Sequence, residues 1–212
     1  MEEVLHLDWI DYAERLIGGG AIEWGSPAAV AGLINKAQAL LPSDLIILPV
    51  GRMLVACASP VELAAKPRGA EPLRSLLGNV LTRGRIVETI QMIPAPALAL
   101  GLPAPAELAV LAARKVGLAA PGIDEDLVDD ASVYVAEFLR IFAGERIAGI
   151  VLTEGAEGSV FRALYAPIRK VAASYGWNYA DGGQPWPDVR SIAIHVDGQP
   201  EAVLAQVRAL RN

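Results

Sequence analysis

The chain has 212 residues, of which 53% are hydrophobic and 20% are charged, and this composition excludes a disordered chain. Its net charge of −6 excludes the lysine and arginine excess of a nucleic-acid-binding surface, so we expect no nucleic-acid partner. The one cysteine, Cys57, excludes a disulfide framework and a cysteine-cluster metal site, which fits a cytoplasmic location.

The mean hydropathy of +0.38 raises the question of a membrane segment. The most apolar stretch, Met92 to Ala113, contains four prolines, and these interrupt any helix long enough to span a bilayer. The chain also opens with Glu2 and Glu3, where a secretory signal peptide would be basic. The sequence therefore predicts no membrane partner.

The first half of the chain predicts helices mixed with short apolar strands. Leu5, Trp9, Tyr12 and Leu16 have helical spacing, which predicts a helix over residues 4–16. Ser26 before Pro27 marks the start of a second helix, because serine is a preferred N-cap. The other elements predicted here are strands over 45–50, 53–57 and 85–93, with helices over 60–65 and 71–81.

The second half shows a clearer alternation of strands and helices. The stretch 94–105 is rich in proline and is interpreted as a loop. The elements predicted after it are helices over 105–116, 124–142 and 159–175, strands over 147–153, 177–180 and 191–196, and a last helix from Pro200. Asp124 is the predicted N-cap of the second of these helices. Such alternation is typical of a parallel α/β sheet. We expect a single α/β domain over 1–212, with residues 1–43 forming a helical segment that packs on it.

Four passages of this second half follow one another in a characteristic order. They are a strand entering a Pro/Gly/Ala loop at 90–101, a helix and strand at 129–154, a helix at 164–173, and a His-x-x-Gly turn that begins at His195. Together they resemble the uroporphyrinogen decarboxylase superfamily, which includes corrinoid-related methyltransferases on the same barrel. The resemblance covers about the last 60% of the chain, from Arg85 onward.

The resemblance implies a barrel of parallel strands with a helix after each strand. A complete eight-stranded barrel needs about 250 residues, whereas this chain is shorter and contains five or six predicted strands. The expected fold class is therefore α/β, with a shortened or incomplete TIM-barrel-like parallel β/α fold. An incomplete barrel exposes strand edges, and a homodimer is one way to cover them.

Polar residues near the predicted strand ends are the candidate site residues, because parallel α/β proteins hold ligands there. They are Gln91, Thr153, Glu154, Asp181, His195 and Asp197. Tyr179 lies between Trp177 and Asp181, and this aromatic group either walls a ligand pocket or belongs to the core. We expect Gln91, Thr153, Tyr179 and Asp181 to bind ligand.

Glu154 and His195 are the candidate catalytic residues. Glu154 can act as a base or metal ligand, or it can stabilise the start of the next helix. His195 interrupts an apolar strand and is either a metal ligand, a general acid or base, or a buried histidine with satisfied hydrogen bonds. Asp197 shares a strand side with His195, or it is simply a turn residue before Gly198.

The resemblance also implies a reaction. In the methyltransferase branch the last motif commonly reads His-x-Cys-Gly, and the pair binds zinc that activates a thiol. Here His195 and Asp197 occupy the two positions, so they are the implied zinc ligands, with Glu154 as a further one. The implied function is methyl transfer to a thiol or a related small-molecule reaction.

Two other functions stay open. One is a lyase that uses Glu154 or His195 as its base. The other is a non-catalytic subunit that binds a small molecule or supports assembly after losing the family's active site. Whether the chain is an enzyme is thus left open by its sequence.

Overall fold

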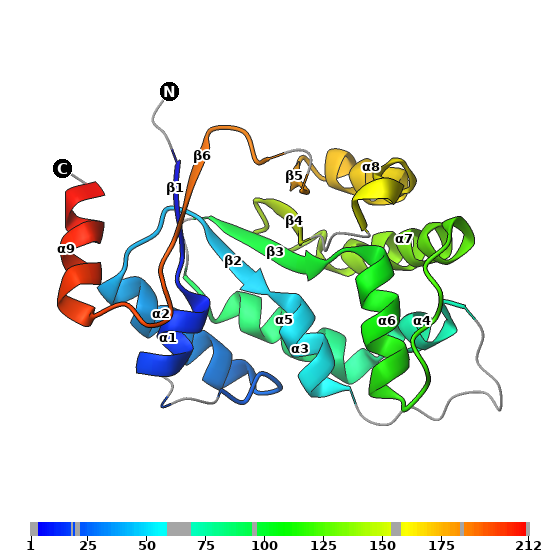
Figure 1. Cartoon of the computed structure of the whole chain (residues 1–212), viewed down its shortest axis with the longest axis horizontal. Helices are drawn as coiled ribbons and strands as arrows, with labels where there is room; N and C mark the ends of the chain where they lie inside the picture. Colours follow the sequence, from blue (N-terminus) through cyan, green and yellow to red (C-terminus); the bar gives the residue numbers. More distant parts are fainter. Residues whose placement is uncertain are drawn as a thin grey trace.

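The computed structural model describes residues 4–17, 19, 22–58, 69–94, 97–153, 158–182 and 185–210. Its strands form two sheets in which all pairs are parallel, which confirms the α/β prediction (Figure 1). One sheet pairs β1 (Val4–Asp8) with β6 (Val189–Ala193). The other has the order β2 (Ile46–Pro49), β3 (Leu98–Pro103), β4 (Gly149–Thr153) and β5 (Asn178–Ala180).

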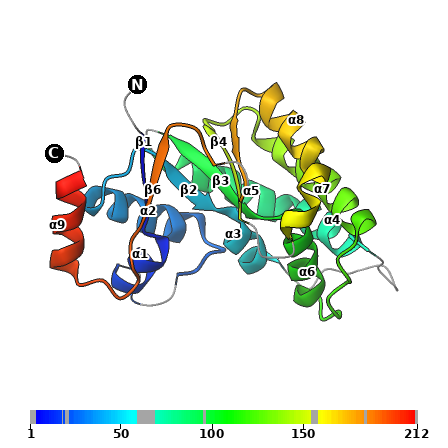
Figure 2. The same ribbon diagram turned by 45° about the horizontal axis from the view of Figure 1, so that its top comes forward.

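Helices connect the successive strands from β1 to β5. They are α1 (Ile10–Leu16), α2 (Pro27–Leu40), α3 (Val50–Cys57), α4 (Glu71–Gly78), α5 (Val80–Gln91), α6 (Pro105–Lys115), α7 (Glu125–Leu139) and α8 (Ala166–Ser174), with 3-10 turns η1 (Arg140–Phe142) and η2 (Gly158–Tyr165). The last helix, α9 (Pro200–Leu210), lies beside β1 and β6, at the opposite end from α6 and α7 (Figures 1 and 2). Within the described ranges, no helix is both long and apolar enough to cross a membrane.

Helix starts follow the predicted capping residues. The Ser26 hydroxyl accepts a hydrogen bond from the Ala29 N–H at 3.4 Å, with Pro27 in the first turn of α2. The Asp124 carboxylate accepts from the Leu127 N–H at 2.9 Å and begins α7. Each cap satisfies an N–H that has no partner inside its helix. The predicted start of the last helix at Pro200 is also confirmed.

The first predicted helix is wrong at its beginning. Residues 4–8 form β1, which pairs with β6 over its whole length, and α1 begins only at Ile10. Trp9 and Tyr12 keep their helical spacing, but Leu5 and Leu7 belong to a strand that is buried on both sides. The segment 1–43 is therefore not purely helical. It contributes a strand to a sheet.

Three further predictions are corrected. Residues 53–57 lie in α3 and residues 85–91 lie in α5, so the two strands predicted there are helices. The proline-rich stretch interpreted as a loop contains β3, whose residues 98–102 are fully buried between β2 and β4. The prolines delimit this strand instead of preventing it, since Pro103 is its last residue and has no ladder hydrogen bond to donate. The predicted helix over 60–65 lies outside the described residues.

The seam between the two sheets is built by the segment Ser43–Leu45. A single bridge between His6 and Leu45, the residue before β2, places β1 beside β2. The Ser43 hydroxyl accepts from the Leu7 N–H at 3.0 Å and lies 2.7 Å from the Leu45 carbonyl oxygen, to which it donates. The Asp44 carboxylate accepts from the Leu5 N–H at 3.0 Å. These side-chain bonds add to the backbone bonds that the Asp44 and Leu45 N–H groups donate to the Leu5 carbonyl, at 2.8 and 3.3 Å.

We predict that Ser43→Ala destabilises the protein by about 1–3 kcal/mol, because the buried Leu7 N–H loses its acceptor. Ser174→Ala is the matched control, since the Ser174 hydroxyl bonds the Val171 carbonyl at an exposed position on α8. Urea unfolding followed by circular dichroism measures both variants. Equal stability of the two variants would contradict the role given to Ser43.

Candidate ligand-binding cavity

A cavity of about 680 Å³ lies at the carboxyl ends of β1, β2, β3 and β4. Parallel α/β proteins hold ligands at this edge of the sheet. Most of its wall is apolar, including Leu7, Ile47, Leu102 and Val151. The polar residues in the wall are His6, Asp8, Asp11, Arg52, Lys115 and Thr153, and the aromatic ones are Trp9 and Trp24.

One row of the sheet beneath the cavity carries no side chain larger than valine. Pro49, Gly101 and Val151 lie side by side in register across β2, β3 and β4. A Cβ atom at Gly101 would lie 2.7 Å from the Ile47 side chain, so only glycine fits there. The inside of a parallel barrel is normally filled by valine, isoleucine and leucine side chains. Pro49 and Gly101 carry less side chain than these residues, which leaves room for a ligand.

His6 is the most buried ionisable residue in the wall, with 7% of its surface exposed. Its Nδ1 lies 3.1 Å from the Leu45 carbonyl oxygen, which can only accept a hydrogen bond. Nδ1 therefore carries the proton, and Nε2 of the neutral ring is the acceptor. Burial lowers the pKa of His6 below its ordinary value of 6.5, against the raising effects of Leu45 and Asp8. The side chain is neutral at pH 7.

Asp8 lies two residues after His6 on the same side of β1, at the end of the strand. It is exposed and belongs to the cavity wall. Its carboxylate forms no hydrogen bond or ion pair with the rest of the described chain. His6 and Asp8 therefore present two hydrogen-bond acceptors along one strand.

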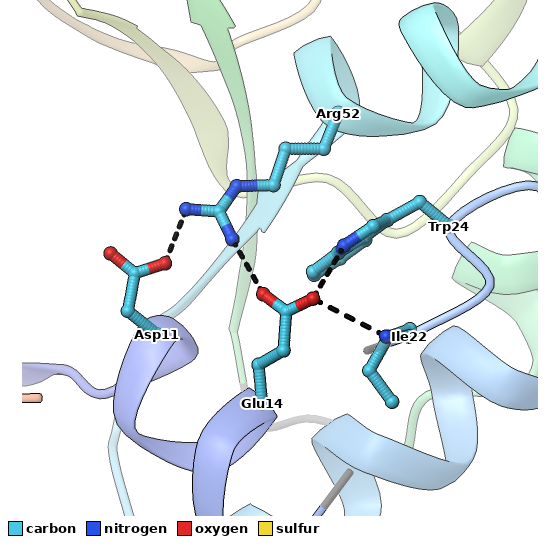
Figure 3. Close-up of polar contacts among 5 residues, drawn as sticks. All are labelled: Asp11, Glu14, Ile22, Trp24 and Arg52. Carbon is cyan, nitrogen blue, oxygen red and sulfur yellow. Dashed lines mark hydrogen bonds and ion pairs between the residues drawn. The ribbon is translucent and has the colours of Figure 1, made fainter. Parts of the chain in front are cut away.

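Arg52 joins α3 to α1 at the cavity (Figure 3). Its guanidinium forms ion pairs with Asp11 and with Glu14, the latter at 3.1 Å. It also lies over the Trp24 ring, 5.3 Å from the ring centre. The second oxygen of Glu14 accepts from the Trp24 indole N–H at 3.1 Å and from the Ile22 N–H at 3.3 Å. Two carboxylates thus compensate the charge of one arginine.

The predicted ligand-binding residues do not come together. Thr153 lies at the end of β4 and lines the cavity, with its hydroxyl 3.3 Å from the Leu102 carbonyl oxygen. Gln91 is the last residue of α5 and not a strand end, and its side chain donates to Glu145 at 3.1 Å on the surface. Its predicted position is wrong because the stretch 85–93 is helical to residue 91.

Tyr179 and Asp181 form a separate polar group at β5. The Tyr179 hydroxyl donates to the Asp181 carboxylate at 2.9 Å, and Arg162 lies 3.9 Å from the other Asp181 oxygen. Burial, followed by the hydrogen bond to Asp181, raises the pKa of Tyr179, so the phenol stays protonated. Neither residue is part of the cavity wall.

His195 and Asp197 lie in the turn after β6, and both are exposed. The Asp197 N–H donates to His195 Nδ1 at 3.2 Å, and the Asp197 carboxylate lies 3.9 Å from an Arg15 nitrogen. A zinc site takes four ligands or three and a water. In the described ranges no three His, Cys, Asp or Glu side chains gather as such a set. Glu154 lies outside the described residues.

Three residues of the cavity wall are not among the predicted site residues: His6, Asp8 and Arg52. The first two lie on residues interpreted as a helix, and Arg52 lies between two predicted strands. A signal for β1 was available, since Leu5 and Leu7 flank His6 in a short apolar run that ends at Asp8.

Comparisons of the chain with models of known protein families, with curated proteins and with solved structures gave no match. The function is therefore inferred from the residues of the cavity themselves.

We predict that the free energy of unfolding falls as the pH is lowered from 7.5 to 5.5. Below about pH 6.5 the unfolded chain protonates His6 while the folded chain does not, which favours unfolding. His6→Asn keeps a donor toward Leu45 but does not titrate, so its stability is expected to fall less over this range. Urea titrations at several pH values measure the slopes.

The matched control is His195→Asn, which replaces the exposed second histidine and is expected to keep the native slope. A native slope in His6→Asn would show that the burial of His6 does not govern this pH dependence.

Proposed function

We propose that the chain binds a small organic molecule in the cavity at the carboxyl ends of β1 to β4. The observation that carries this proposal is the position of the cavity, which combines an apolar wall with a few polar groups at strand ends. Its volume of about 680 Å³ lies within the usual range for such ligands, about 300–1,000 Å³. The small-residue row supports a built site, because it leaves space where a packed barrel has side chains.

We further propose that the fold is a shortened relative of the TIM barrel. Supporting this, the His6–Leu45 bridge extends the strand order to β6-β1-β2-β3-β4-β5, which is sequential from β1 to β5 and parallel throughout. The motifs from Arg85 onward that resemble the uroporphyrinogen decarboxylase superfamily support the same relationship. If β5 and β6 paired, the six strands would form a closed ring.

Small-molecule binding is better supported than methyl transfer through a zinc-bound thiol. The residues that the resemblance implies as zinc ligands, His195 and Asp197, are exposed and lie outside the cavity wall. Asp197 is also engaged by Arg15. The cavity wall instead offers a neutral histidine and a carboxylate, which suit hydrogen bonding to an organic ligand.

We predict that Val151→Phe abolishes binding of small aromatic probes such as indole, because the larger side chain fills the small-residue row of the cavity. Val133→Phe, which places the same change on the exposed face of α7, is the matched control and is expected to bind normally. Titration of indole followed by NMR chemical shifts measures binding. Equal binding by Val151→Phe and Val133→Phe would place the ligand elsewhere.

A further inference from the structure

The ionisable groups of the cavity wall divide into compensated and uncompensated ones. Arg52 forms ion pairs with Asp11 and Glu14, so two carboxylates already balance the positive charge of its guanidinium. Lys115 ends α6 and has an exposed side chain without an ion pair among the described residues. Asp8 is the uncompensated carboxylate of the wall. Around the cavity, the three carboxylates of Asp8, Asp11 and Glu14 outnumber the two cations, Arg52 and Lys115.

On the β1 side of the cavity, the side chains of His6 and Asp8 offer acceptors, whereas the indole N–H of Trp9, which has no partner among the described residues, is buried. His6 is more than nine-tenths buried, its Nδ1 is used by Leu45, and it makes no second hydrogen bond with a described residue. Nε2 is consequently an open acceptor in the wall. Asp8 follows on the same side of the strand, about 6–7 Å further along. A ligand that bonds to both His6 and Asp8 must bring the hydrogen-bond donors.

We propose that the ligand is an organic cation, with an ammonium group that donates to His6 and Asp8 and an aromatic or aliphatic body against the apolar wall. This inference rests on the proposed function and names its ligand class. An ammonium has donors for both acceptors, and its charge is complementary to Asp8. A carboxylate would face Asp8 as a like charge and Nε2 as a second acceptor. An anionic ligand would have to pair with Lys115, which is the exposed last residue of α6.

Three probes that share one aromatic body test the charge preference: tryptamine, indole and indole-3-propionate. Isothermal titration at pH 7.5 is expected to give a dissociation constant for tryptamine about tenfold lower than for indole. Indole-3-propionate is expected to bind more weakly than indole. In Asp8→Asn, tryptamine should lose its advantage and approach the affinity of indole.

The matched control is Asp129→Asn, which removes the same charge from an exposed position on α7 outside the cavity wall. It should keep the full preference for tryptamine, since the preference arises at Asp8 and not from the net charge. Thermal unfolding confirms that both variants are folded.

The two proposals fail in different ways. If indole binds but indole-3-propionate binds as tightly as tryptamine, the cation assignment is overturned and the ligand-binding function stands. The same holds if Asp8→Asn keeps the tenfold preference. If none of the three probes binds at millimolar concentration, the cavity is not a site for such molecules and both proposals fall.

Discussion

The hydrogen bonds between β1 and the segment Ser43–Leu45 hold the two parallel sheets of this protein side by side. They also decide where the cavity can be, because its wall takes His6 and Asp8 from β1 and the row of small residues from the other sheet. Gln38 supports the segment from α2, donating to the Ser43 carbonyl at 2.7 Å and accepting from the Ser43 N–H at 3.0 Å. One buried serine therefore links the helical layer, the sheet and the candidate site.

Local signals in the sequence predicted much of the fold. Apolar runs located β2, β4, β5 and β6, and capping residues located the starts of α2 and α7. The errors have a common cause. Residues 4–8 and 98–103 become strands through pairing with segments far away in the chain, and such pairing leaves little trace in nearby residues. Helical spacing in one case and prolines in the other pointed away from it.

The candidate site was harder to predict than the fold. Thr153 was placed correctly at a strand end, but its neighbours in the wall come from residues 6–11, 52 and 115, which no sequence motif connects. Motifs such as that of His195 identify residues that are close in sequence. The importance of His6 comes instead from burial and from its bond to Leu45, which are visible only in three dimensions.

Side chains on β2, β3 and β4 alternate between the two faces of the sheet, so substitutions on one face differ in effect from those on the other. Leu48, Leu100 and Ile150 point into the helical core and are fully buried, whereas their odd-numbered neighbours form the row beneath the cavity. Recognition can then be altered at Val151 of β4, while Gly101 and the buried even positions keep the fold. A substitution at this one position can change which ligand is selected and leave the packing on the helical side of the sheet intact.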